Sequence, residues 1–343
     1  MTKASAGLLL SLPPPQVAAD VLASLAKAHW GLAGSLTPLT SERDQNHRLD
    51  TETGSFTLKL ANPAEDFALT EAQTLALLHV EAAAPALPAP RVVAARDGRA
   101  IIPTPGGALR LLTWCNGTPL ALLHRSPGLS NAIGRALGRL DATLATFHHP
   151  ATDHTLLWDM RNAASLAPLI PALPADLQPQ ATAFLRRFNS HIAPALARLP
   201  RQVIHGDFNP HNLLADPAQP ERLTGVLDFG DITFSHRICD LAVAGSYLID
   251  PDDPLGLLMP LVAGYHATNP LVTEELALLP DLLIARLVTT LTISAWRAAR
   301  YPDNAPYILR NAPASRTGLA ALGRVKPTHL ADQLQSACER PLS

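Results

Sequence analysis

The sequence contains little of what several large protein classes depend on. Only 16% of its 343 residues are charged, and the formal net charge is −2. We therefore expect neither a basic surface for nucleic acid nor a like-charge interaction tail. The three cysteines, Cys115, Cys239 and Cys338, lie far apart and show no C-x-x-C spacing. This excludes a disulfide framework and a zinc ribbon, and it favours a reduced, cytoplasmic setting.

Long uninterrupted apolar runs are also missing. The most apolar late segment, residues 278–296, is interrupted by Asp281 and Arg286. We interpret it as a buried helix of a globular lobe, so no membrane partner is expected. The short apolar run near the N-terminus follows a single lysine and precedes the Pro13–Pro15 cluster. A frayed N-terminus is the better interpretation of this run than a signal peptide.

Apolar residues and prolines are abundant instead. Hydrophobic residues make up 47% of the chain, enough for a sizeable core, and 32 prolines divide it into short elements. In the first third, residues 16–29 and 64–80 show apolar side chains at helical spacing. Short strands are predicted elsewhere in this part, with a hairpin turn at Thr51–Gly54; they cover His47–Asp50, Phe56–Leu60, Arg91–Ala95 and Leu109–Trp114.

The pattern changes near residue 116. Residues 130–148, 179–199 and most of the chain after 236 are predicted to be helical. Short strands are expected between these helices, at Gln202–His205, Leu213–Ala215 and Thr224–Phe229. The sequence thus predicts an α+β protein with two lobes. Residues 1–115 form a small lobe of antiparallel sheet plus helix with an N-terminal helical extension, and residues 116–343 form a larger, mainly helical lobe. A cleft between two lobes is a natural ligand site.

Two segments of the larger lobe carry most of the chemistry. Asp207 ends an apolar strand-like run and Asn212 follows five positions later, while Asp228 ends the run Gly225–Leu227. Phosphoryl transfer needs an aligned acceptor oxygen, a metal ion that neutralises charge and a clamp on the phosphates. A carboxylate base suits the first task, and carboxylate and amide oxygens suit Mg²⁺. Each aspartate alone is better explained as a turn residue, but the combination favours a phosphotransferase.

These segments resemble those of the aminoglycoside phosphotransferase and choline kinase superfamily. The resemblance is carried by His205–Asn212, Leu227–Asp231 and Asp240–Ala242. It implies a protein-kinase-like fold, with Asp207 as catalytic base assisted by His205, which orients the loop. It also implies that Asn212 and Asp228 bind Mg²⁺, and that Asp240 braces the loop from the next helix.

The same resemblance assigns the nucleotide clamp to the small lobe. Lys59 is expected on the α and β phosphates of ATP or GTP, with Glu71 as its ion-pair partner and Glu65 in reserve. Residues 41–47 occupy the place of the phosphate-covering loop, where the amides of Gln45 and Asn46 are candidate contacts and a plain hairpin is an equal alternative. The adenine is expected near Trp114 and Cys115, for which core packing is an equally good explanation.

Within the superfamily, the loop sequences resemble most closely those of hydroxylysine kinase-like members. We predict Mg²⁺-dependent transfer from ATP or GTP to a small hydroxylated amine or amino acid, with a hydroxylysine-like acceptor ranked first. Homoserine, choline-type and aminoglycoside acceptors are alternatives, and a catalytically silent nucleotide-binding module or a hydrolase remains open. An amino-acid acceptor needs a cation for its carboxylate; the candidates are Arg237, Arg286, Arg297 and Arg300.

Overall fold

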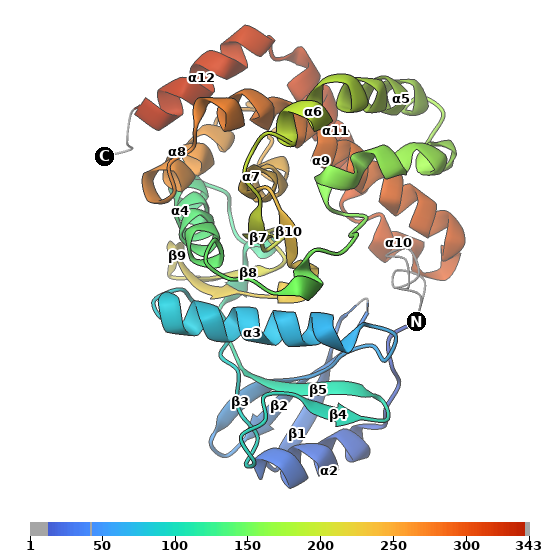
Figure 1. Ribbon diagram of the computed structural model, residues 1–343, viewed down its shortest axis with the longest axis vertical. Coiled ribbons are helices and arrows are strands. Elements are labelled where there is room, and N and C mark those ends of the chain that lie inside the picture. The colour runs from blue at the N-terminus through green and yellow to red at the C-terminus, as the bar shows by residue number, and fades with distance from the viewer. Residues whose placement is uncertain (1–12, 42, 340–343) are drawn as a thin grey trace.

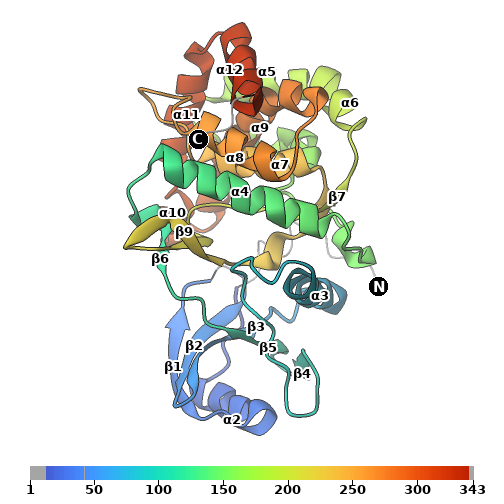
Figure 2. The ribbon, with the colours of Figure 1, turned by 90° about the vertical axis from the view of Figure 1, so that its left-hand side faces the viewer.

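The computed structural model describes residues 13–41 and 43–339. It confirms the predicted α+β architecture with a small sheet-containing lobe and a larger helical lobe (Figures 1 and 2). Most of the N-terminal run expected to be frayed lies outside the described residues. The division of the chain at residues 115 and 116 stays a prediction.

A five-stranded antiparallel sheet forms the small lobe, in the order β1-β2-β3-β5-β4. The strands are β1 Gly34–Leu39, β2 Gln45–Thr51, β3 Gly54–Leu60, β4 Ile102–Thr104 and β5 Gly107–Thr113. The predicted hairpin is confirmed, because Thr51 pairs with Gly54. The strand predicted at Arg91–Ala95 is wrong in extent. β4 pairs with the first half of the free edge of β5, which leaves only one bridge, from Val92 to Leu112, along the second half.

One side of this sheet is covered by α2 (Ala19–Trp30), as the helical spacing of residues 16–29 predicted. Gly31, with a φ of 72°, ends the helix in the left-handed conformation that glycine adopts without strain. Leu22 of α2 packs with Leu49, Leu58 and Leu109 of the strands, all at most 1% exposed. The small lobe therefore has a core of its own.

The helix α3 (Phe67–Ala83) lies between the sheet and the larger lobe (Figure 1). Asp66 caps its first turn by accepting a bond from the Ala68 N–H. Its buried residues Ala76 and Val80 belong to the apolar core of the larger lobe. The polar side of α3 faces the sheet, so this helix connects the two lobes.

The larger lobe contains most of the helices together with five short strands. Its strands are β6 Thr118–Pro119, β7 Gln202–Ile204, β8 Leu213–Asp216, β9 Gln219–Val226 and β10 Thr233–Ser235. Its main α-helices are α4 Pro127–Leu144, α5 Gln178–Arg187, α6 Ala193–Leu196, α7 Arg237–Ser246, α8 Leu258–Thr268, α9 Thr273–Arg300, α10 Ala305–Ile308, α11 Ala312–Arg324 and α12 Pro327–Glu339. The strands predicted at 202–205 and 213–215 are confirmed, whereas the one predicted at 224–229 ends at Val226.

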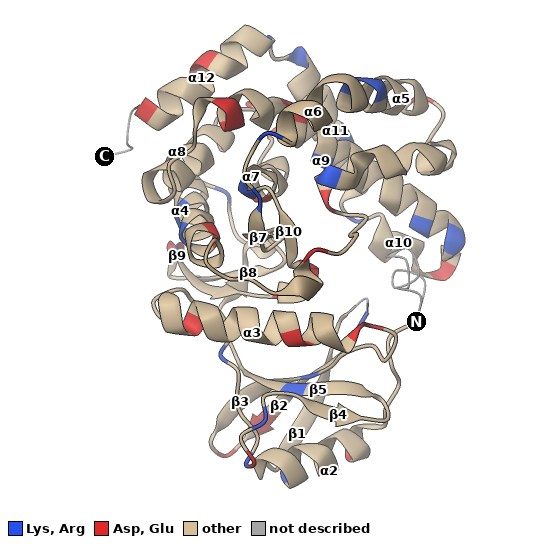
Figure 3. Cartoon of the chain, in the orientation of Figure 1, with Lys and Arg blue, Asp and Glu red and all other residues tan. Residues whose placement is uncertain are grey.

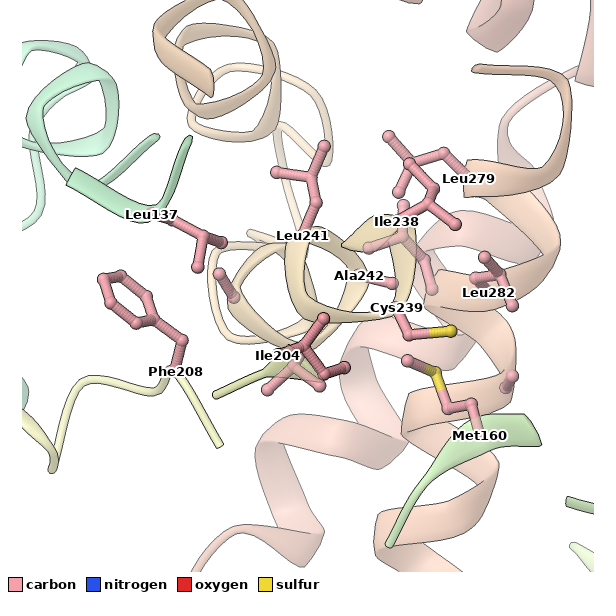
Figure 4. Close-up of a cluster of buried hydrophobic side chains, with 14 of the residues drawn as sticks. Leu137, Met160, Ile204, Phe208, Ile238, Cys239, Leu241, Ala242, Leu279 and Leu282 are labelled. Atoms are coloured by element: carbon pink, nitrogen blue, oxygen red, sulfur yellow. The ribbon is translucent and has the colours of Figure 1, made fainter. Parts of the chain in front are cut away.

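The core of this lobe surrounds α7 (Figure 4). Ile238 and Leu241 of α7 are fully buried and belong to one apolar cluster with Leu137 of α4 and Leu282 of α9. Phe208, also fully buried, extends the cluster to the loop after β7. The buried side chain of Phe208 thus anchors the loop that carries Asp207 in the core.

The helix α9 is long and apolar enough to cross a membrane by length and composition alone. However, 78% of its most apolar 18-residue window is buried inside the protein. Asp281 and Arg286 also interrupt its surface, as noted from the sequence. The packing is that of the central helix of a globular lobe.

Candidate active site

The loop after β7 has a tightly constrained backbone. Gly206 has a φ of 79°, and a Cβ on this residue would lie 2.4 Å from the Asp231 carbonyl oxygen. The two carboxylate oxygens of Asp240 accept bonds from the backbone N–H groups of His205 and Gly206, at 2.8 Å each. Asp240, near the start of α7, therefore braces the loop, as the family resemblance implied.

His205 holds this loop against the segment that leads to Asp228. Its side chain is fully buried, and its Nε2 lies 3.0 Å from the Leu227 carbonyl oxygen. The rings of Phe208 and Phe229 contact it edge-on. His205 does not line the cavity described below. Its position fits the orienting role and gives it no contact with a ligand.

A second buried carboxyl lies behind Asp240. The Oδ2 of Asp141, a fully buried residue of α4, accepts the Tyr265 hydroxyl at 2.7 Å, and the Asp141 carboxyl hydrogen-bonds that of Asp240. Burial, followed by the nearby Asp240 charge, raises the pKa of Asp141 well above its ordinary value. Its Oδ1 has no hydrogen-bond partner among the described residues. The raised pKa favours the protonated form of Asp141 behind Asp240.

Asp207 and Asn212 are brought together by the loop between them. The Asn212 Nδ2 donates to the Asp207 carboxylate at 2.9 Å and to its carbonyl at 3.0 Å. On the other side, the Arg286 guanidinium of α9 donates to Asp207 Oδ1 at 3.2 Å. Burial raises the pKa of the Asp207 carboxyl, and the Arg286 charge opposes that shift. Two donors therefore orient this carboxylate.

Asp228 follows β9 in a strained conformation. Its φ of 57° is the one positive value among the described non-glycine residues, and its side chain accepts the Gly230 N–H at 3.2 Å. Such a backbone costs on the order of 1–3 kcal/mol and occurs most often at functional sites. It turns the carboxylate toward Lys59, whose Nζ lies 3.2 Å away and which holds the pKa of Asp228 well below its usual range.

The donor set of Asn212 and Asp228 fits Mg²⁺. The Asp228 carboxylate is ionised and about half exposed, at 48%. The amide of Asn212 donates to Asp207 through nitrogen, and its oxygen has no donor among the described residues. Mg²⁺ prefers one or two protein oxygens and takes its other ligands from water and phosphates. No group of three His, Cys, Asp or Glu side chains suited to a closed metal site occurs within residues 13–41 and 43–339.

Lys59 of β3 has different partners from those predicted. Its Nζ lies 3.2 Å from Asp44 Oδ2, in addition to its contact with Asp228. Burial lowers the pKa of Lys59, but the two carboxylates outweigh this effect and raise it. The predicted pair with Glu71 is wrong, because Glu71 lies 3.6 Å from the His149 ring on the outer side of α3. The reserve candidate, Glu65, accepts a bond from Thr70 instead.

The inner side of α3 presents a glutamine where an acidic partner for Lys59 was expected. Gln73 is 2% exposed, accepts from the Arg110 guanidinium of β5 at 3.0 Å and donates to the Gly230 carbonyl at 3.4 Å. This side chain ties α3 to both the sheet and the turn after Asp228. The sequence shows that position 73 shares a helix face with apolar residues, but not which lobe that face meets.

The predicted phosphate-covering loop contributes mainly charged side chains to the cavity, and only one of its two candidate amides. Arg43 donates to Asp231 at 2.5 Å, next to the Lys59–Asp44 pair. Asn46 lines the cavity, and its Oδ1 is buried without a described donor. The Gln45 amide exchanges two bonds with the backbone of Val17, at 2.7 and 2.8 Å, and does not line the cavity. Gln45 therefore fastens the N-terminal segment to β2.

The predicted adenine contacts lie outside this cavity. The Arg48 guanidinium lies over the Trp114 ring, 4.7 Å from its centroid. Cys115 is partly buried, which raises the pKa of its thiol. Both residues are on the segment that leads from β5 into the larger lobe. Their contact with a base stays a prediction.

A cavity of about 290 Å³ contains Lys59, Asp207, Asn212 and Asp228 in its walls. They come from three segments, because Asp207 and Asn212 share one loop, and they meet between the small and the large lobe. Residues predicted to perform one reaction therefore share one space, although they lie up to 169 positions apart in the chain. The arrangement provides a carboxylate base, two oxygen ligands for a hard cation and a lysine for phosphates.

Three arginines line the same cavity from the large lobe, namely Arg286 and Arg297 of α9 and Arg310 beyond α10. Of the four arginines proposed as acceptor cations, two are thus placed at the site. Arg237 instead forms a pair with Glu275 at 2.7 Å, and Arg300 contacts Tyr301. Arg310 was not anticipated, because only the turn through α10 brings it back to the cavity.

Comparison with known proteins agrees with this geometry. Residues 35–278 match the model of the phosphotransferase enzyme family. Hydroxylysine kinase of Danio rerio is 28% identical over 333 residues, which cover 91% of this chain and 92% of that protein. Homoserine kinase of Methylobacillus flagellatus is 26% identical over 257 residues, which cover 74% of each chain.

Solved structures of other kinases share the fold. A microcompartment-associated aminopropanol kinase superposes with a TM-score of 0.68 and 21% identity, over 94% of this chain and all of the other. An amicoumacin kinase bound to AMP-PNP and Ca²⁺ gives the same TM-score with 16% identity, over 91% and 95% of the two chains. The predicted protein-kinase-like fold is confirmed. Because the family model matches well over half of the sequence, this chain belongs to the phosphotransferase enzyme family and is a small-molecule kinase.

Proposed function

We propose that this kinase transfers the γ-phosphate of ATP or GTP, with Mg²⁺, to the hydroxyl of a small amine or amino acid. The observation that carries the proposal is the meeting of Asp207, Asn212, Asp228 and Lys59 in one cavity. Nucleotides are present in several kinases of the same fold, as AMP-PNP, ADP or GDP. We expect the protein to act in the cytoplasm, where its three unpaired cysteines would stay reduced.

Each residue has a distinct part in this reaction. The Asp207 carboxylate, oriented by Asn212 and Arg286, accepts the proton of the acceptor hydroxyl. The hydroxyl oxygen bonds to the γ-phosphorus as the bond from that phosphorus to the bridging oxygen breaks, and the nucleoside diphosphate leaves. Lys59 binds the phosphates, for which it exchanges its carboxylate partners. Asn212 and Asp228 would hold Mg²⁺, which neutralises charge on the phosphates when bound.

A hydroxylysine-like acceptor ranks first. Three of the four relatives named hydroxylysine kinase match 80 to 91% of this chain and the fourth matches 59%, whereas the homoserine kinases match 74 to 77%. Homoserine is the second candidate. Aminoglycoside acceptors rank lower, because the solved aminoglycoside phosphotransferases share the fold with this chain at only 15 to 17% identity. Choline-type acceptors rank with them.

The test is a turnover assay with purified protein, Mg²⁺ and either ATP or GTP. Candidate acceptors are 5-hydroxylysine, homoserine, choline and kanamycin, and the product is identified by mass spectrometry. We expect a mono-phosphorylated acceptor in step with nucleoside diphosphate. Diphosphate without a phosphorylated acceptor would indicate a hydrolase. Absence of both, with nucleotide still bound, would indicate a silent nucleotide-binding module.

A further inference from the structure

Arg43 connects the two lobes beside the proposed metal ligands. It belongs to the predicted phosphate-covering loop of the small lobe, and its Nη2 donates to Asp231 Oδ1 of the large lobe at 2.5 Å. Both side chains line the cavity and are partly buried, 24% and 13% exposed. Figure 3 shows both basic and acidic positions along the boundary between the two lobes. The guanidinium of Arg43 therefore reaches from one lobe to the wall formed by the other.

Both the backbone and the side chain of Arg43 are held in place. The buried Asn62 amide, just beyond β3, donates to the Arg43 carbonyl at 3.1 Å. This bond ties the loop to the end of the strand that carries Lys59. A Cβ on Gly230 would lie 3.1 Å from the Arg43 Nη2, so the guanidinium lies against the turn that follows Asp228. The protein itself thus fixes the position of this cation.

Only one end of the guanidinium takes part in these contacts. Its Nη2 carries the bond to Asp231, and neither Nε nor Nη1 donates to another of the described residues. An arginine side chain has five N–H donors in a planar fork, so most of them remain for a ligand. Arg43 therefore combines an anchored end with donors that a second anion can use.

The charges around Arg43 explain why a triphosphate needs a cation at this place. The Asp231 carboxylate raises the pKa of Arg43 against the effect of burial, and three further carboxylates add to the rise, namely those of Asp228, Glu65 and Asp44. These carboxylates would repel a triphosphate that enters this part of the cavity. A guanidinium that stays charged among them reduces the repulsion.

The position of Arg43 relative to the proposed base indicates which phosphate it meets. A Cβ on Gly206 would lie 3.6 Å from the Asp231 Cβ, so the partner of Arg43 lies beside the residue that precedes Asp207. The transferred phosphoryl group must lie between the acceptor hydroxyl, at Asp207, and the phosphates bound by Lys59. Arg43 is thus placed at the end of the triphosphate that reacts.

We propose that Arg43 binds the γ-phosphoryl group of the nucleotide while its Nη2 stays on Asp231. This inference rests on the proposed function, because it adds a catalytic residue to the same reaction. A guanidinium offers a phosphate two parallel hydrogen bonds. It also stabilises the charge on the phosphoryl oxygens as the bond to the leaving nucleoside diphosphate breaks. Its loss should therefore lower kcat more than it weakens nucleotide binding.

The test compares nucleotides that differ in the γ-phosphate. Calorimetry with Mg²⁺ measures the binding of AMP-PNP and ADP, or of their guanine counterparts, to Arg43→Met. We expect AMP-PNP affinity to fall about tenfold. ADP affinity should change by less than about twofold, which also shows that the variant is folded. The kcat for phosphoryl transfer should fall by about 100-fold or more. Arg99→Met breaks a surface pair with Asp97 in the same lobe, so it is the matched control and should change none of these values.

Asp231→Asn separates phosphate binding from a clamp between the lobes. This variant removes the ion pair but keeps the guanidinium, so it should weaken AMP-PNP binding by less than about threefold. If the pair only held the lobes together, Asp231→Asn and Arg43→Met would weaken AMP-PNP binding equally, and the inference would be overturned.

Two other results would also overturn the inference, namely equal losses for AMP-PNP and ADP, or no loss at all, in Arg43→Met. A wild-type protein that bound neither nucleotide would refute both the inference and the proposed function. A selective loss of AMP-PNP binding in a protein that phosphorylates no acceptor would support the inference and refute the proposed function alone.

Discussion

The two walls of the cavity use similar charges in different ways. On the small-lobe side each cation faces carboxylates, since Lys59 lies between Asp44 and Asp228, and Arg43 pairs with Asp231. On the large-lobe side the described lining residues include the three arginines Arg286, Arg297 and Arg310 and the three aspartates Asp207, Asp228 and Asp231. The first arrangement keeps a buried lysine charged. In the proposed reaction, phosphates would replace its carboxylate partners. The second holds the carboxylate of Asp207 in place through the Arg286 guanidinium.

The largest effect is expected where the two walls meet, at Asp207. Asp207→Asn keeps the size of the side chain but removes the proton acceptor, so kcat should fall by about a thousandfold. Nucleotide affinity should change little, because Lys59 and Asp228, the proposed contacts to the phosphates and the metal, are retained. Stopped assays and nucleotide titration measure the two quantities. Wild-type rates in a folded variant would disprove the assignment of the base.

The division between walls is tested by exchanging one cation on each side. Lys59→Met should raise the KM of the nucleotide by about 10- to 100-fold and leave the KM of the acceptor nearly unchanged. Arg286→Met removes a donor to Asp207, so it should lower kcat and leave the KM of the nucleotide nearly unchanged. Steady-state kinetics with both substrates varied would measure the four constants. If each variant altered both KM values equally, the walls would not be functionally separate.

Asp141, buried behind Asp240, should make the stability of the fold depend on pH. In the folded protein the pKa of Asp141 is raised, so the fold holds a proton that the unfolded chain releases above about pH 4. The folded state then binds more protons than the unfolded one, and stability falls as pH rises, by up to about 1.4 kcal/mol per pH unit. Asp141→Asn cannot ionise and still offers a donor to Asp240 and an acceptor to Tyr265. As pH rises from 4 to 8, the free energy of unfolding of this variant should therefore increase relative to that of the wild type.

Urea unfolding at a series of pH values would measure this gain. Tyr265→Phe is the control, because it removes a donor to Asp141 but keeps the titrating group. It should cost about 1 kcal/mol and retain the pH slope of the wild type. Parallel pH profiles for Asp141→Asn and the wild type would show that Asp141 is ionised in the fold.

The smallest effect is expected at Glu71. Because this residue faces His149 and not Lys59, Glu71→Gln should change the nucleotide KM by less than about twofold, as for other partly exposed pairs. Asp44→Asn removes a partner that Lys59 does have, and it should change that KM more. An effect of Glu71→Gln as large as that of Lys59→Met would mean that α3 moves to restore the predicted pair when nucleotide binds.

Features set by consecutive residues could be predicted from the sequence. The loop from His205 to Asn212 and the turn at Asp228 each lie within a few positions, so residue type and spacing define them. The two-lobed order also follows from local periodicity. The fold thus needed little long-range information.

Features that depend on packing between distant segments could not be predicted. The partner of Lys59 depends on which side of α3 faces the sheet, and Gln73 occupies that side. Gln45 was expected at the phosphates, but the chain near Val17 passes close enough to satisfy its amide. Arg310 reaches the cavity because α10 turns the chain back. In each case a tertiary contact determines which of several similar side chains reaches the cavity, and the local sequence does not.

Gly206 allows the loop that carries Asp207 to pack closely against the segment that contains Asp231. Its N–H donates to the Asp240 carboxylate. The Asp231 carbonyl oxygen occupies the space that a Cβ at position 206 would need, and the Asp231 side chain pairs with Arg43. Even a methyl group at 206 would push these two segments apart. A residue with no functional group therefore sets the separation between the Asp207 loop and the segment of Asp231, and random mutagenesis should identify position 206 as being as intolerant as position 207.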